Sequence, residues 1–235
     1  MYRPVLLLQL GEAPDAVVRT HGTFASWYER SFGESLHGHD GRRGGRGPEP
    51  RDFAGIIVTG SSASLTRPEP WMDDACDVLL RAADAGVPVL GVCFGHQLIG
   101  RAFGAAVTRN PRGWEIGTDA VSLTEAGRKD PLFAGLGPSL RVNLTHEDHV
   151  EPGGVELTVL AGNPHTPLQA VAVDGHVRGV QFHPEMNGAV IRSYIAARRP
   201  VLVGLDPDAL AARAADCPDG LAVFANFRRH YVGRS

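Results

Sequence analysis

The sequence predicts an α/β fold with a mostly parallel central sheet flanked by helices. Short apolar runs rich in valine, isoleucine and leucine alternate with stretches whose apolar residues recur at helical spacing. Continuous apolar strands are typical of parallel sheets, because helices cover both faces of such a sheet. The chain has 235 residues, 43% of them hydrophobic and 21% charged, which is enough apolar surface for one large folded domain.

Three β-α units are predicted in the first part of the chain. Each begins with a short apolar run and continues into a helical pattern that ends near a glycine or a change in polarity. The predicted strands cover residues 5–10, 55–58 and 87–92, and the predicted helices cover residues 22–32, 71–85 and 94–103. The third strand therefore meets its helix at Cys93.

The second part of the chain is richer in predicted strands. They cover residues 118–123, 140–144, 157–161, 168–173 and 177–182, and helices are predicted over residues 190–198, 208–215 and 221–231. We interpret residues 1–235 as a single domain, with a core over about 4–199 and a C-terminal helical extension over about 200–235. We expect this extension to pack against the sheet, and a surface for a partner is the alternative.

Residues 37–48 differ from the rest of the chain. This segment is rich in glycine and arginine and contains too few apolar side chains to bury. We predict a loop, most simply a solvated insertion. A mobile lid over an active site and a phosphate-binding patch are the alternatives.

Composition and charge exclude several classes of protein. The net charge of −3 gives no strong field toward nucleic acid or anionic lipid, so a small-molecule substrate is expected. The chain has three cysteines, Cys76, Cys93 and Cys217, too few and too scattered for a disulfide framework or a metal cluster. No apolar run reaches the length of a membrane span. We therefore expect a cytoplasmic protein with no metal.

The strongest chemical motif surrounds Cys93. A buried strand leads into Gly91-Val92-Cys93-Phe94-Gly95, and a helix begins at once. In such a nucleophile elbow the flanking glycines leave room for the backbone to reverse, so that the central side chain projects above the sheet. The N-terminus of the following helix favours a thiolate and can donate hydrogen bonds to a developing oxyanion. Cys76 and Cys217 lack this setting and are interpreted as structural.

A cysteine nucleophile requires a base, and His183 is the best placed of the ten histidines. It follows a predicted strand and precedes Pro184 and Glu185. The proline favours an extended conformation at His183, in which residues two apart share a side. Glu185 can then orient the imidazole, which is the third role in a catalytic triad.

Together, the two motifs resemble those of the class I, triad-type glutamine amidotransferases, in particular stand-alone members similar to the glutaminase domain of GMP synthase. The residues that carry the resemblance are Gly91-Val92-Cys93-Phe94-Gly95-His96-Gln97 and Gln181-Phe182-His183-Pro184-Glu185. The resemblance implies a flavodoxin-like fold and cleavage of the γ-carboxamide of glutamine through a thioester. It implies that Cys93 is the nucleophile, His183 the base and then the acid, and Glu185 the orienting carboxylate.

The resemblance also implies roles for other positions. The Gly60 region and the Phe94 N–H would form the oxyanion hole, and His96 would be structural. The positions implied to contact the substrate are Ser61, Gln97, Thr145 and His146. Two departures concern substrate selection: Glu147 stands where the family has a glycine, and residues 37–48 stand where the family has a second strand and a short loop.

Several functions remain open from the sequence. The leading one is hydrolysis of γ-glutamyl amides or peptides by a free-standing enzyme. A glutaminase subunit that delivers ammonia to a separate synthase is the second, because no P-loop pattern occurs in this chain. A non-catalytic module that binds a metabolite is the third. No cofactor is expected, since the glycines around Cys93 do not have dinucleotide-binding spacing.

Overall fold

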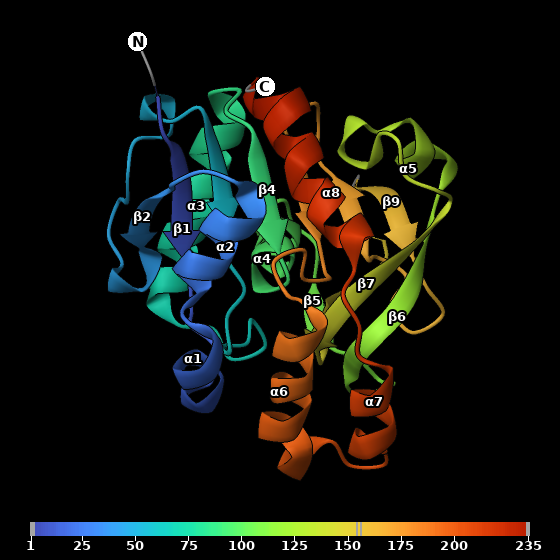
Figure 1. Ribbon diagram of the computed structural model, residues 1–235. Helices are drawn as coiled ribbons and strands as arrows, with labels where there is room; N and C mark the ends of the chain where they lie inside the picture. Colours follow the sequence, from blue (N-terminus) through green and yellow to red (C-terminus); the bar gives the residue numbers. More distant parts are fainter. Residues whose placement is uncertain (1–2, 154, 156, 234–235) are drawn as a thin grey trace.

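The computed structural model describes residues 3–153, 155 and 157–233, and it confirms the predicted α/β class (Figure 1). A nine-stranded sheet has the order β2-β1-β3-β4-β11-β10-β9-β6-β7. Its first five strands are parallel, and the remaining pairings are antiparallel. The parallel half places the carboxyl ends of β1, β3, β4 and β11 along one edge, where sites of open α/β sheets form.

Most strands of the structure overlap the apolar runs that predicted them. The large sheet contains β1 (Val5–Gln9), β2 (His37–Asp40), β3 (Gly55–Val58), β4 (Val89–Val92), β6 (Glu115–Leu123), β7 (Ser139–His146), β9 (Thr158–Gly162), β10 (Ala170–Ala172) and β11 (Val177–Val180). A separate two-stranded sheet pairs β5 (Val107–Arg109) with β8 (Asp148–Val150). The sequence did not predict β5 or β8, which are only three residues long.

Helices cover both faces of the sheet. They are α1 (Asp15–His21), α2 (Phe24–Phe32), α3 (Pro70–Asp84), α4 (Phe94–Ala102), α5 (Glu125–Lys129), α6 (Gly188–Arg198), α7 (Pro207–Arg213) and α8 (Pro218–Phe227). Figure 1 shows α2 and α8 in front of the strands and α3 behind them. No helix within the described residues is long and apolar enough to cross a membrane.

Alternate residues of β1 belong to two different hydrophobic clusters. Val5 and Leu7 pack with the aromatic side chains of α2 and α8, whereas Leu6 and Leu8 pack with α3 and α4. Successive side chains of a strand point to opposite faces, so a strand covered on both sides needs apolar residues at every position. This explains the uninterrupted apolar run of β1.

The prediction of a loop over residues 37–48 was wrong at its start. His37–Asp40 form β2, which pairs in parallel with β1 from Leu6↔His37 to Gln9↔Asp40. Backbone hydrogen bonds to β1 hold this strand although it contains no apolar side chain, and an edge strand tolerates polar residues. A short 3₁₀ turn, Gly41–Arg43, follows, and the Gly45 N–H donates to Asp74 on α3 over 2.7 Å. The segment is therefore attached to the domain.

The helices near the C-terminus contribute to the core. Phe224 and Phe227 of α8 are fully buried. The Phe224 ring lies 5.7 Å from that of Tyr28 and 6.2 Å from that of Phe32, both on α2. Burial of such aromatic side chains contributes about 1.5–3 kcal/mol each to stability. As expected, this helical segment packs against the rest of the fold.

The approach of α4 to β4 generates a prediction on stability. A Cβ added to Gly91 on β4 would lie 2.5 Å from the Gly95 carbonyl oxygen, whereas a Cβ added to Gly175 would meet nothing within 4 Å. We expect Gly91→Ala to lower the free energy of unfolding by about 1–3 kcal/mol, and Gly175→Ala to change it by less than about 0.5 kcal/mol. Urea unfolding monitored by circular dichroism measures both. Equal, small changes in the free energy of unfolding would show that stability does not require α4 to approach β4 this closely.

Candidate active site

Cys93 occupies a strained turn between β4 and α4. Its φ of 52° and ψ of −102° lie in a region of backbone conformation that residues other than glycine rarely adopt. The turn is held at both ends, because the Cys93 N–H donates to the Val180 carbonyl over 2.8 Å and its carbonyl accepts from the Gln97 N–H over 3.0 Å. The strand-turn-helix expected for a nucleophile elbow is therefore present.

His183 and Glu185 form a buried pair next to this turn. The Nδ1 atom of His183 donates to Oε1 of Glu185 over 2.6 Å, and both side chains are almost completely buried. The Nε2 atom of His183 is buried and has no hydrogen-bond partner within the described residues. Because Glu185 occupies Nδ1, the free Nε2 is the atom available for proton transfer.

Sheet topology brings His183 to Cys93. β11 pairs in parallel with β4, with Val180 opposite Val92. Cys93 and His183 follow the ends of these adjacent strands, so both lie at the same edge of the sheet. A Cβ added to Gly60 would lie 3.3 Å from Cε1 of His183 and 3.8 Å from Cβ of Cys93. Burial alone would lower the pKa of His183, but the charges of Glu185 and Cys93 outweigh it and raise the pKa to about 10. The imidazole therefore stabilises an adjacent thiolate.

Two backbone donors were expected at the oxyanion hole, and they differ in their hydrogen bonds in the structure. Phe94 is the first residue of α4, where backbone N–H groups have no partner within the helix. The Gly60 N–H instead donates to the Tyr28 hydroxyl over 3.3 Å. Among the described residues the next N–H in the loop, that of Ser61, has no hydrogen-bond acceptor. Burial, followed by the charge of Glu185, raises the pKa of Tyr28 well above its usual range, so this hydroxyl remains neutral.

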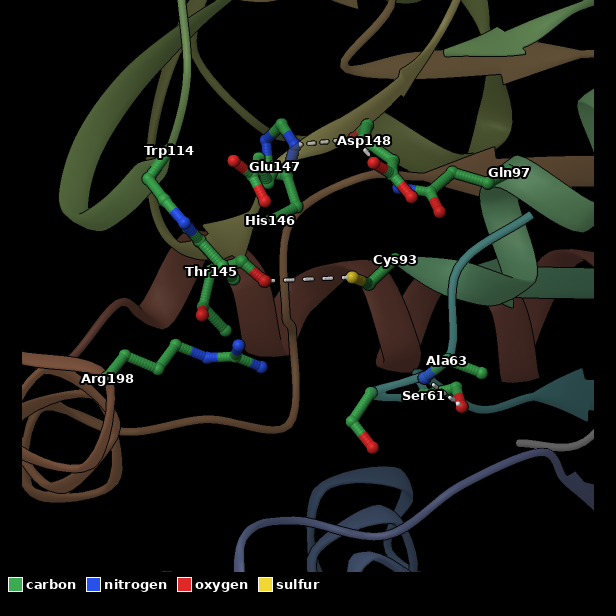
Figure 2. Close-up of a pocket in the computed structure, with 11 residues that line it drawn as sticks. Ser61, Ala63, Cys93, Gln97, Trp114, Thr145, His146, Glu147, Asp148 and Arg198 are labelled. Atoms are coloured by element: carbon green, nitrogen blue, oxygen red, sulfur yellow. Dashed lines mark hydrogen bonds between the residues drawn. The ribbon is translucent and has the colours of Figure 1, made fainter. Parts of the chain in front are cut away.

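A cavity of about 130 Å³ opens beside the Cys93 thiol (Figure 2). It brings together Cys93 and all four residues that were expected to contact a substrate. Its lining consists of Ser61, Ser62, Ala63, Cys93, Gln97, Trp114, Thr145, His146, Glu147, Asp148 and Arg198. The Thr145 carbonyl lies 3.9 Å from the Cys93 Sγ, so the thiol forms the floor between β4 and the end of β7.

Gln97 and His146 are held in the cavity wall by hydrogen bonds. The Gln97 amide nitrogen donates to the Asp148 carbonyl over 2.9 Å and to Oε1 of Gln181 over 3.1 Å. The ring nitrogens of His146 face the Asp148 carbonyl at 3.0 Å and Oε2 of Glu115 at 2.8 Å. Both nitrogens of His146 are thus already engaged, and the ring shapes the wall rather than offering a free polar atom.

The sequence predicted no role for the carboxylate that supports this wall. Glu115, at the start of β6, accepts hydrogen bonds from His146, Asn163, Thr166 and Gln169. Burial alone would raise the pKa of Glu115, but the hydrogen bond from His146 and the other favourable contacts lower it. Local patterns cannot reveal this network, because its members come from separate strands and loops.

The sequence also predicted no role at the cavity for Arg198 or Trp114, although the segment that contains Trp114 resembles stand-alone members of the family. The Arg198 guanidinium carbon lies 4.6 Å from the centre of the Trp114 ring and 5.6 Å from that of Tyr194. The expected helix ends at Arg198, but nothing in the local sequence distinguishes it from Arg199. Its place in the cavity depends on how α6 returns toward β6.

Other reactive side chains lie outside the site. Burial raises the pKa of the Cys76 thiol and of the Cys217 thiol to about 11, so both are protonated near neutral pH. His96 is fully buried against Gly179, and burial lowers its pKa to about 3, which agrees with the expected structural role. In the part of the chain that the structure describes, no three His, Cys, Asp or Glu side chains are arranged to hold a metal ion.

Comparison with solved structures supports the architecture. A glutamine amidotransferase from Methylobacillus flagellatus superposes with a TM-score of 0.77 over 97% of this chain and 95% of that chain, at 22% sequence identity. At this level of identity the similarity concerns the fold.

Sequence comparisons identify three kinds of relative. A putative glutamine amidotransferase-like protein of Schizosaccharomyces pombe is 32% identical over 65% of this chain and 62% of its own length. Gamma-glutamyl peptidase 5 of Arabidopsis thaliana is 28% identical over 74% of this chain and 72% of its own length. The GMP synthase of Aeropyrum pernix is 35% identical over 57% of this chain, but this match spans only 24% of the synthase.

The family assignment rests on a match to a family model. The family model described as glutamine amidotransferase class-I matches residues 46–198. This range contains the elbow, the histidine with its carboxylate, and the cavity wall built by β6, β7 and the end of α6. The chain therefore belongs to the class-I glutamine amidotransferase family.

Proposed function

We propose that this protein hydrolyses the γ-glutamyl amide bond of glutamine or a γ-glutamyl compound through a thioester on Cys93. One observation carries the proposal: a thiol in a strained turn at the start of α4 shares a cavity with the free Nε2 side of the His183–Glu185 pair. Membership in the family and the relative named as a gamma-glutamyl peptidase support the substrate class.

In the first half of the reaction, His183 takes the thiol proton and the Cys93 sulfur attacks the γ-carbonyl carbon. The carbon–nitrogen bond then breaks, and His183 gives its proton to the leaving nitrogen, which departs as ammonia or an amine. Glu185 holds the imidazole in the required tautomer and stabilises its charged form. The product of this half is a γ-glutamyl thioester.

In the second half, water replaces the leaving amine beside His183. His183 removes a proton from the water, the oxygen attacks the thioester carbon, and the carbon–sulfur bond breaks. The proton on His183 neutralises the departing thiolate or remains shared with it. The products are glutamate and the free Cys93 side chain, and the sum of both halves is the addition of one water across the amide.

The oxyanion of each tetrahedral intermediate needs backbone donors. We assign them to the Phe94 N–H at the start of α4 and to the Gly60–Ser61 loop at the end of β3. Since Tyr28 already holds the Gly60 N–H, the Ser61 N–H is the free donor of that loop. Removing one such donor typically costs 10²–10³-fold in kcat.

The γ-glutamyl group fits the cavity wall that contains Gln97, Thr145 and His146. The neighbouring acids Glu147 and Asp148 line the same wall. Glu147 also pairs with Arg109, and the remaining negative charge of this wall suits the positive α-amino group of the substrate. Ser61 lies on the opposite loop, next to the reacting carbonyl. No cofactor takes part in this mechanism.

Two forms of this activity differ in their partner. A free-standing hydrolase acts alone, whereas a glutaminase subunit delivers ammonia to a separate synthase. The match to one quarter of a GMP synthase supports the second form, and the match to most of a peptidase supports the first. We favour the free-standing hydrolase, acting in the cytoplasm, where free thiols such as the three cysteines of this chain persist.

The nucleophile can be tested by alkylation. A chloroketone analogue of glutamine should label Cys93 at least about tenfold faster than Cys76 or Cys217 at pH 7, because a thiol with a raised pKa contains little thiolate. Peptide mass mapping over a time course gives the three rates, and excess glutamine should slow only the labelling of Cys93. Earlier labelling of Cys76 would remove the support for this assignment.

The roles of the other two triad residues predict an order of effects. His183→Ala should remove nearly all turnover, by about 10⁴-fold or more, because it removes the proton carrier. Glu185→Gln should leave a weaker enzyme, since the orienting group is supportive. Steady-state kinetics on variants with native circular dichroism spectra measures both. Equal and small losses would contradict the triad.

The free-standing form predicts turnover without added protein. The purified chain should hydrolyse glutamine or a γ-glutamyl amide at about 1 per second or faster, and Cys93→Ala should abolish this rate. Release of ammonia or amine is the readout. A background rate on every substrate that rises only when a co-purifying synthase is supplied would favour the subunit.

A further inference from the structure

The guanidinium of Arg198 lacks a counter-ion. Within the described residues no carboxylate comes within 4.0 Å of it, and its Nε–H is buried without a hydrogen-bond partner. Its neighbour Arg199 is exposed and pairs with Asp208. A partly buried cation whose Nε–H is buried without a partner is costly, so it marks a position where an anion binds.

Aromatic contacts fix the position of this cation. The guanidinium stacks over Trp114 and lies beside Tyr194, one turn earlier on α6. Such contacts hold an arginine in place without neutralising it. Burial also lowers the pKa of Arg198, but an arginine remains charged at neutral pH.

Nearby acids have other partners. Glu147 forms an ion pair with Arg109 over 2.8 Å. Glu12, which lines a narrow cavity together with Arg198, accepts the backbone N–H groups of Ala13 and Phe24 over 2.9 and 2.8 Å. The protein therefore supplies other contacts for both carboxylates and leaves Arg198 open.

Arg198 lies on the His183 side of the Cys93 thiol. It lines the cavity beside Cys93 and also a narrow extension that reaches His183, whereas Gln97 and Asp148 line only the first. Figure 2 shows Arg198 on one side of the Cys93 sulfur and Gln97 with Asp148 on the other. Because His183 gives a proton to the leaving nitrogen, that nitrogen must face the extension.

We propose that Arg198 binds a carboxylate carried by the leaving amine, and that it makes the enzyme selective for γ-glutamyl amino acids or peptides over glutamine. This inference rests on the proposed function for the position of the γ-glutamyl group. Ammonia, the leaving group from glutamine, has no carboxylate and leaves Arg198 unpaired. An amino acid leaving group supplies the missing anion, and the planar guanidinium can bind it through two hydrogen bonds.

Kinetics with two matched substrates tests the selectivity. We expect kcat/KM for γ-glutamylglycine to exceed that for γ-glutamylglycinamide by about 10- to 100-fold, the usual range for a hydrogen-bonded charge. Arg198→Met should bring this ratio close to one, and Arg198→Lys should retain part of it. Arg199→Met is the matched control and should keep the wild-type ratio.

Binding to an inactive protein separates this inference from the proposed function. In a Cys93→Ser background, calorimetry should show γ-glutamylglycine binding about 10- to 100-fold more tightly than its amide, with the preference lost in Arg198→Met. Should the wild-type protein fail to hydrolyse either compound while this preference persists, the proposed function fails and the role of Arg198 stands.

Three results would overturn the inference. One is an equal kcat/KM for the acid and the amide in the wild-type protein, which needs no variant. Another is the absence of a preference for the acid in the Cys93→Ser background. The third is an equal loss of glutamine and γ-glutamylglycine hydrolysis in Arg198→Met, which would place the α-carboxylate of the γ-glutamyl group on Arg198 instead.

Discussion

The site depends on the parallel pairing of β4 with β11. This pairing ends both strands at the same edge, so Cys93 leaves one strand where the chain toward His183 leaves the other. The backbone hydrogen bond from Cys93 to Val180 joins the two ends and opposes relaxation of the strained turn. Shifting the register of β11 by one residue would reverse its side chains and move the histidine away from the thiol.

Electrostatics divides the cavity into two regions with different tasks. On the His183 side, the Glu185 carboxylate accepts a hydrogen bond from Nδ1 of the imidazole, and Nε2 has no partner within the described residues. On the far wall, Glu115 accepts hydrogen bonds from His146 and three other donors, which hold that part of the wall in place. A wall held by hydrogen bonds, next to an imidazole with one free nitrogen, suits the proposed chemistry, in which positions are maintained while charge moves.

The sequence predicted the structural features that short stretches of residues determine by themselves. The apolar runs of β1, β3, β4 and β11 and the elbow at Cys93 were visible because strand burial and turn geometry impose residue types directly. β2 was missed because His37–Asp40 contain no apolar residue and pair only through the backbone. The resemblance implied an oxyanion hole that includes the Gly60 region, but it could not indicate that the hydroxyl of Tyr28, from a distant helix, accepts the Gly60 N–H and leaves the Ser61 N–H free.

The role proposed for Arg198 illustrates why substrate selectivity is harder to predict than the reaction. A nucleophile, a base and an orienting acid must stand in fixed relation to strand ends, so they leave a motif. A selectivity residue needs only to reach the leaving group, and any element that passes the cavity can supply it. Here α6 ends beside Trp114, which precedes β6 in the sequence. The stacking of the Arg198 guanidinium on the Trp114 ring places this cation in the cavity. In the proposed mechanism, a change in how α6 ends would therefore change which leaving amine the site accepts, without changing the three residues proposed for catalysis.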